Sequence, residues 1–98
     1  MKILAIEKEI DGITPKLIQP YLEDEARQVW ELYKSGIVRE IYFGKEDHCA
    51  VIILECSSIE EAEEYLSALP LVKEKLISFE LKTLLPYDGF ERILLNNL

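Results

Sequence analysis

The distribution of apolar residues along this chain predicts four strands. Ile3 to Ile6 are continuously apolar, which is typical of a strand covered on both faces. Two further apolar runs flank the short polar loop 44–47, so they are expected to form an antiparallel hairpin. The second strand of this hairpin is also apolar on both faces. The last predicted strand stops before Pro86. The predicted strands are Lys2–Lys8, Ile37–Phe43, His48–Glu55 and Ile77–Leu85.

A helical repeat of apolar residues predicts a helix that ends at Lys34. Its apolar stripe comprises Leu22, Ala26, Val29 and Tyr33. The helix begins either after Thr14, an N-cap followed by a first-turn proline, or anew at Pro20. Gly36 is the expected left-handed cap.

A second helix is predicted to begin after Ser58. Ser58 and Glu61 have the spacing of a capping box, and Pro70 stops the helix. Residues 71–76 are expected to form a short helical turn. The apolar tail Phe90–Leu98 is not expected to remain in water.

The element order is β-α-β-β-α-β, which predicts one α+β domain over residues 1–98 with a ferredoxin-like fold. This fold has a four-stranded antiparallel sheet with both helices on one face. The first and third strands would be central, and both are apolar on the face that the helices leave open. A second copy of the sheet is therefore the expected cover, and we expect a homodimer. The alternative is that the C-terminal tail covers this face alone.

The net charge of -8 argues against nucleic acid and anionic membranes as partners, because both attract clusters of Lys and Arg. No signal peptide and no membrane-spanning segment is expected. Cys49 and Cys56 stand at opposite ends of one predicted strand, beyond the reach of a disulfide, so free thiols and a cytoplasmic location are expected. A single His and two separated Cys do not make a zinc site.

One face of the predicted hairpin carries candidate chemistry. If Phe43 lies opposite His48, alternation puts Arg39 on the same face as His48 and the small Ala50. A cation and a titratable imidazole on an apolar face would suit a small anion. The ordinary alternatives are a solvated His48 and an Arg39 paired with a glutamate at a sheet edge, for which Glu7, Glu40 and Glu80 are available.

Two glutamates are further candidates for proton transfer. Glu80 stands in the middle of the last strand, and Glu25 lies beside the apolar stripe of the first helix. A carboxyl group that faces a core is costly unless it is paired or functional. Both residues have a surface position as the alternative.

The chain resembles the muconolactone isomerase family of the dimeric α+β barrel group. The resemblance covers roughly residues 25–86. It rests on Gly36 with Arg39 and Tyr42 in the next strand, on His48 with Ala50, on the capped helix from Ser58, on the Leu69-Pro70-Leu71 turn and on the strand with Glu80. The segment after Leu71 and the end of the second strand, where a second basic residue is expected, depart from the family pattern.

This resemblance implies a cofactor-free isomerase, active as a dimer or a larger ring, that acts on a small anionic metabolite. By position, Arg39 would bind the carboxylate, with Tyr42 and Ala50 beside it, and His48, Glu25 or Glu80 would move the proton. Two alternatives stay open. One is a non-catalytic ligand-binding or stress-associated dimer, and the other is a cofactor-free monooxygenase.

Overall fold

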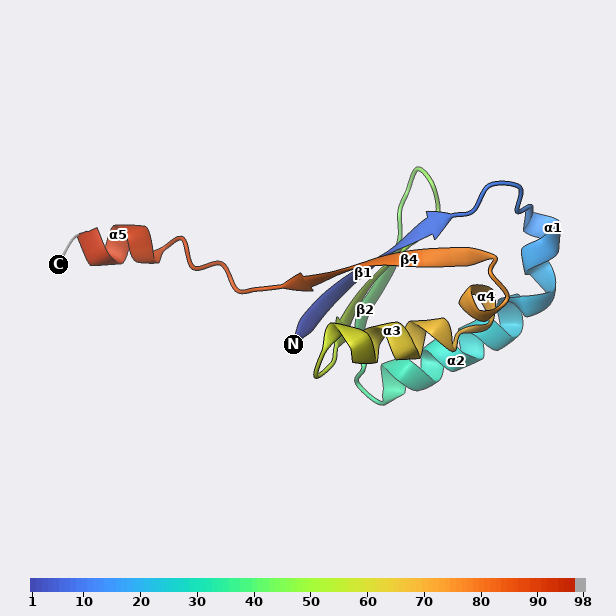
Figure 1. The fold of residues 1–98 in the computed structure, drawn as a ribbon, viewed down its shortest axis with the longest axis horizontal. Coiled ribbons are helices and arrows are strands. Elements are labelled where there is room, and N and C mark those ends of the chain that lie inside the picture. The colour runs from blue at the N-terminus through green and yellow to red at the C-terminus, as the bar shows by residue number, and fades with distance from the viewer. Residues whose placement is uncertain (97–98) are drawn as a thin grey trace.

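The computed structural model describes residues 1–96 and has a four-stranded antiparallel sheet in the order β2-β3-β1-β4 (Figure 1). This order and the alternation of helices with strands confirm the predicted ferredoxin-like α+β fold. The strands are β1 (Lys2–Glu9), β2 (Val38–Phe43), β3 (Ala50–Glu55) and β4 (Ile77–Leu84). The helices are α1 (Pro15–Ile18), the 3-10 turn η1 (Gln19–Tyr21), α2 (Leu22–Lys34), α3 (Ile59–Ser67), α4 (Pro70–Lys73) and α5 (Glu91–Asn96).

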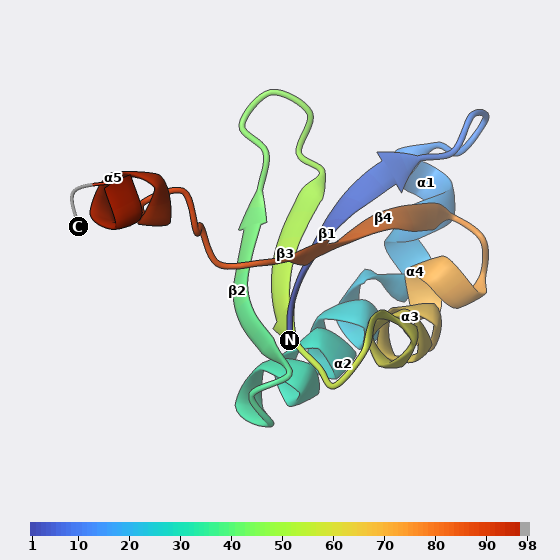
Figure 2. The same cartoon turned by 60° about the vertical axis from the view of Figure 1, so that its left-hand side comes forward.

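The core lies between the sheet and one layer of helices, with α1 to α4 all on the same face (Figure 2). Strands β1 and β3 are central, as predicted, and alternate residues of both point into this layer. Ile3, Ile52 and Leu54 are almost completely buried there, together with Leu66 from α3. This alternation fixes which side chains face the helices and which face away.

Leu54→Ala is expected to lower the free energy of unfolding by about 2–5 kcal/mol, since it removes a side chain from a packed core. Leu54 has no exposed surface and belongs to the main core cluster. Urea denaturation measures the loss. Leu17→Ala is the matched control, because the Leu17 side chain is 49% exposed, and it should cost much less. Equal losses for the two variants would contradict this account of the core.

The connection into the first long helix uses both predicted starts. Pro15 begins α1, and Pro20 lies in the 3-10 turn that leads into α2. Gly36 has a φ of 85°, and the Ile37 N–H donates to the Leu32 carbonyl oxygen, so the predicted left-handed cap ends α2. Ser58 caps α3 as predicted, with its hydroxyl oxygen accepting from the Glu61 N–H.

The apolar stripe predicted for α2 does not form a continuous core contact. Val29 packs against the main core, but Leu22 and Tyr33 remain 43% and 49% exposed. Trp30, at 55% exposure, stacks on Tyr33. These side chains stay accessible because a cavity separates this side of α2 from the sheet.

Helices α1 to α4 leave the opposite face of the sheet uncovered (Figure 2). Leu4, Ile6, Val51 and Ile53 pair across β1 and β3 on this face, and all four are half-buried. We call these four residues the open face.

The C-terminal segment after β4 extends away from the sheet and carries α5 at its end (Figure 1). We call residues 85–96 the arm. It is helical at its end and covers neither face of its own sheet, so the alternative in which this tail alone covers the open face is wrong for the part that the structure describes. Residues 97 and 98 of the predicted tail lie outside the described residues. Leu85, Tyr87, Phe90, Ile93 and Leu94 are between 62% and 85% exposed.

Candidate active site

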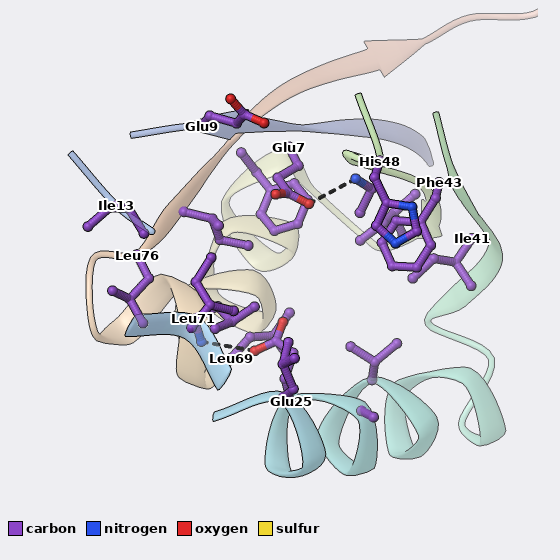
Figure 3. A pocket seen from close by; sticks show the side chains of 18 of the residues that line it. Glu7, Glu9, Ile13, Glu25, Ile41, Phe43, His48, Leu69, Leu71 and Leu76 are labelled. Carbon is purple, nitrogen blue, oxygen red and sulfur yellow. Dashed lines mark hydrogen bonds between the residues drawn. The ribbon is translucent and has the colours of Figure 1, made fainter. Parts of the chain in front are cut away.

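A cavity of about 920 Å³ lies between α2 and the sheet (Figure 3). This volume is within the range of small-molecule sites. Its walls come from β1, α1, α2, β2, β3, α4 and β4, and they are mostly apolar, with Ile13, Val29, Ile41, Ile52 and Leu71 among them. The few polar groups that reach this space are therefore the candidates for chemistry.

Glu25 projects from α2 into the cavity (Figure 3). It lies one turn before Val29 on the side of the helix that faces the sheet. Its Oε1 accepts a hydrogen bond of 2.9 Å from the Leu71 N–H, in the first turn of α4. The carboxyl group is thus held in place by the backbone of a second element.

Burial raises the pKa of Glu25 above its ordinary value, because desolvation disfavours the charged form. The hydrogen bond from Leu71 opposes this shift, whereas the negative charges of Glu7 and Asp24 add to it. A glutamate with a raised pKa is better suited to exchange protons near neutral pH than a solvated one.

Glu7 reaches the same cavity from β1 (Figure 3). Its Oε1 accepts a hydrogen bond of 2.8 Å from the N–H of Ala50 at the start of β3. Glu7 is half-buried and shares the helix-covered face of β1 with Ile3 and Ala5. Two carboxyl groups from different elements therefore meet in one apolar space.

His48 lies at the rim of the cavity, in the hairpin between β2 and β3. Its backbone has a φ of 57°, a left-handed conformation that residues other than glycine rarely adopt. The ring stacks on Phe43 with 4.0 Å between centroids. Phe43 and His48 are both exposed, so the imidazole remains accessible from solvent.

The structure brings together three of the residues predicted from the sequence. Glu25, His48 and Ala50 all line the cavity. The predicted register was wrong by two residues, because Phe43 pairs with Ala50 rather than with His48. A shift of two residues keeps Ile41 and Phe43 on the face they were predicted to share with Ala50 and Ile52.

Arg39 does not share this face with His48. The register of β2 shifts between Val38 and Glu40, so Arg39 is the extra residue of a β-bulge. Its Nε donates a hydrogen bond of 2.6 Å to the Gly36 carbonyl oxygen, and it does not line the cavity. None of the suggested glutamates holds it by a hydrogen bond or ion pair in residues 1–96.

Tyr42 and Glu80 lie on the face of the sheet away from the cavity. The Tyr42 hydroxyl donates to Glu40 Oε1 at 2.8 Å, and the neighbouring carboxylate raises the pKa of Tyr42. Glu80 pairs with Lys8 at 3.2 Å and is exposed. Within one subunit, neither residue can reach a ligand in this cavity.

Sequence reasoning missed Glu7 as a site residue and considered it only as a partner for Arg39. The signal was present in the alternation of β1. Glu7 stands two and four residues after Ala5 and Ile3, which places all three on the same face. The alternation in β1 does not indicate that a cavity above this strand has space for a carboxyl group.

Residues 1–96 contain no cluster of three or more His, Cys, Asp or Glu side chains arranged to hold a metal ion. In the same part of the chain, no helix is long and apolar enough to cross a membrane.

The raised pKa of Glu25 predicts how stability varies with pH. Because the folded protein holds this proton more tightly than the unfolded chain, the free energy of unfolding is expected to fall as pH rises above about 4.5 through the folded pKa. Glu25→Gln removes this titration while keeping an oxygen for the Leu71 N–H. Urea denaturation at a series of pH values should show that the free energy of unfolding of the variant, relative to the wild type, increases as pH rises from about 4 to about 7. A constant difference across this range would contradict the prediction.

Solved structures show which known fold this is. Muconolactone isomerase superposes with a TM-score of 0.72 at 17% sequence identity, over 91% of this chain and 93% of that one. This chain has the fold of muconolactone isomerase. The resemblance predicted from the sequence is thereby confirmed for the fold.

Two further structures agree with this assignment. The 5-chloro-2-hydroxyhydroquinone dehydrochlorinase of Burkholderia phenoliruptrix AC1100, in complex with 2,5-dihydroxybenzoquinone, has a TM-score of 0.62 at 15% identity, over 91% of this chain and 98% of that one. A protein of Agrobacterium tumefaciens has a TM-score of 0.50 at 20% identity, over 90% and 95%. No protein-family model and no curated protein sequence matches the chain.

Proposed function

We propose that this protein is a small cofactor-free enzyme that moves a proton within an unsaturated lactone or a related carbonyl compound. The observation that carries the proposal is Glu25, a half-buried carboxyl group with a raised pKa in an apolar cavity. The likeness in fold to muconolactone isomerase and to a dehydrochlorinase supports this class of chemistry.

In the proposed reaction Glu25 acts as the general base and then as the acid. Its carboxylate takes a proton from a carbon of the ring, so that the C–H bond breaks, an O–H bond forms on Glu25 and the electron pair delocalises onto the lactone carbonyl. The Glu25 carboxyl group, whose proton exchanges with solvent between the two steps, then gives a proton to a different ring carbon, which forms a new C–H bond and restores the carboxylate. The double bond moves, and no other reactant is consumed.

Two lactones test this proposal. One is muconolactone, and the other is the same unsaturated ring with a methyl group in place of the carboxymethyl group. NMR in D₂O follows the migration of the double bond and the incorporation of deuterium. We expect the protein to accelerate isomerisation of at least one of them over buffer. No acceleration of either lactone, despite binding, would favour the non-catalytic ligand-binding protein.

We further propose that the protein is a homodimer. The open face presents four half-buried apolar residues, and the arm presents exposed apolar side chains that do not cover their own sheet. Apolar surface of this kind is typical of an interface. A second copy of the same sheet would cover the open face with matching apolar side chains.

A further inference from the structure

We propose that this cavity selects an uncharged ligand over a carboxylate, and that Glu7 is the residue that sets the preference. The inference rests on the proposed function in one respect, namely that the same cavity holds the ligand. It differs from the expectation of an anionic metabolite, which depended on Arg39 together with His48 and on the family resemblance; of these two residues only His48 lines the cavity.

The charges around the cavity are the first argument. Among residues 1–96, its lining includes Glu7, Glu9, Glu25 and Asp47 but no Lys or Arg. Three cations of the neighbouring elements have partners outside the cavity. Arg39 is hydrogen-bonded to Gly36. Lys8 is paired with Glu80 on the other face of the sheet, and Lys34 is paired with Glu31.

The positions of the acidic groups are the second argument. Glu7 and Glu25 both point into the space, whereas Asp47 accepts from the Cys49 N–H within the hairpin (Figure 3). The negative charge of Glu7 already disfavours the ionised form of Glu25. A ligand carboxylate would add a further negative charge in apolar surroundings, where charges are poorly screened.

The unused hydrogen-bonding capacity of the two carboxyl groups is the third argument. A carboxylate has about four acceptor positions. The hydrogen bonds from the Ala50 and Leu71 backbone use one position on each group. An ionised ligand carboxylate only accepts hydrogen bonds and can satisfy none of the remaining positions, whereas the ring of an uncharged lactone packs against walls such as Ile52 and Leu71.

Glu7 determines ligand specificity and not the reaction, because it places a negative charge in the cavity but takes no part in the proton transfer assigned to Glu25. Its place is fixed by the Ala50 N–H at 2.8 Å, and a glutamine would keep that acceptor through its amide oxygen. Glu7→Gln therefore removes one negative charge from the cavity while preserving the contact with β3.

The experiment measures binding of the two lactones separately from their turnover. NMR titration follows the backbone N–H signals of Ala50 and Leu71, which bond to the two carboxyl groups. We expect the wild type to bind the methyl lactone at least tenfold more tightly than muconolactone. Glu7→Gln should narrow this ratio several-fold. Glu64→Gln, which removes the same charge from an exposed position on α3, should leave it unchanged.

Three results would overturn the inference. They are muconolactone binding as tightly as the methyl lactone, an unchanged ratio in Glu7→Gln, and no binding of either lactone in the cavity. Preferential binding without isomerisation would instead retain the inference and remove the proposed reaction, so the two failures are distinguishable.

Discussion

Glu25→Gln is expected to slow isomerisation of the better lactone substrate by about 10²–10⁴-fold, the usual contribution of a general acid–base. The glutamine amide oxygen can still accept from the Leu71 N–H, so the link between α2 and α4 should remain. What the variant loses is the carboxylate that takes and returns the proton. Deuterium incorporation, followed by NMR, measures the loss of isomerisation. Circular dichroism of the variant measures whether the fold is retained.

Two control variants make this result specific. Glu31→Gln removes an exposed carboxylate from the same helix and should retain full activity. His48→Asn removes the imidazole at the rim of the cavity, and asparagine tolerates the positive φ at this position. Full activity of Glu25→Gln combined with an inactive His48→Asn would assign the proton transfer to His48 instead.

Val51→Lys on the open face is expected to convert the proposed homodimer into a monomer. A dimer with twofold symmetry carries each substitution twice. Burying an unpaired charge costs about 2 kcal/mol or more per site. Two sites together give about 4 kcal/mol, or about a 10³-fold rise in the dissociation constant. Size-exclusion chromatography with light scattering measures the change across a range of protein concentrations.

The matched control places the same charge outside the proposed interface. Ser67→Lys lies at the exposed end of α3, on the helical side of the sheet, and should leave the dimer intact. A monomeric wild type at low micromolar concentration, or a Val51→Lys protein that remains dimeric, would refute this interface.

The periodicity of the sequence predicted the secondary structure and topology well, because local signals determine both. The caps at Ser58 and Gly36 have specific hydrogen bonds, and the apolar character of β1 and β3 matches their central places in the sheet. The bulge at Arg39 could not be predicted in this way. Nothing in alternating apolar residues indicates that one residue of β2 will be left without a partner on β3.

The candidate site was predicted only in part, since its residues meet through tertiary packing. Glu25 was identified because it lies beside an apolar stripe, and that signal belongs to one helix. Its contact with Leu71 spans 46 positions, and the contact of Glu7 with Ala50 spans 43. No pattern within a single element could show that these four residues surround one space.

These two contacts also restrict which substitutions the cavity can accept. Each joins a carboxylate from the β1-α2-β2 half of the chain to a backbone N–H from the β3-α3-β4 half. The groups available for chemistry are therefore the same groups that fasten the two halves of the fold at this end. A substitution that adapts the cavity to a new ligand by removing either carboxylate also loosens this joint. Adaptation of the site in this protein is thus restricted to side chains that keep an acceptor at both positions.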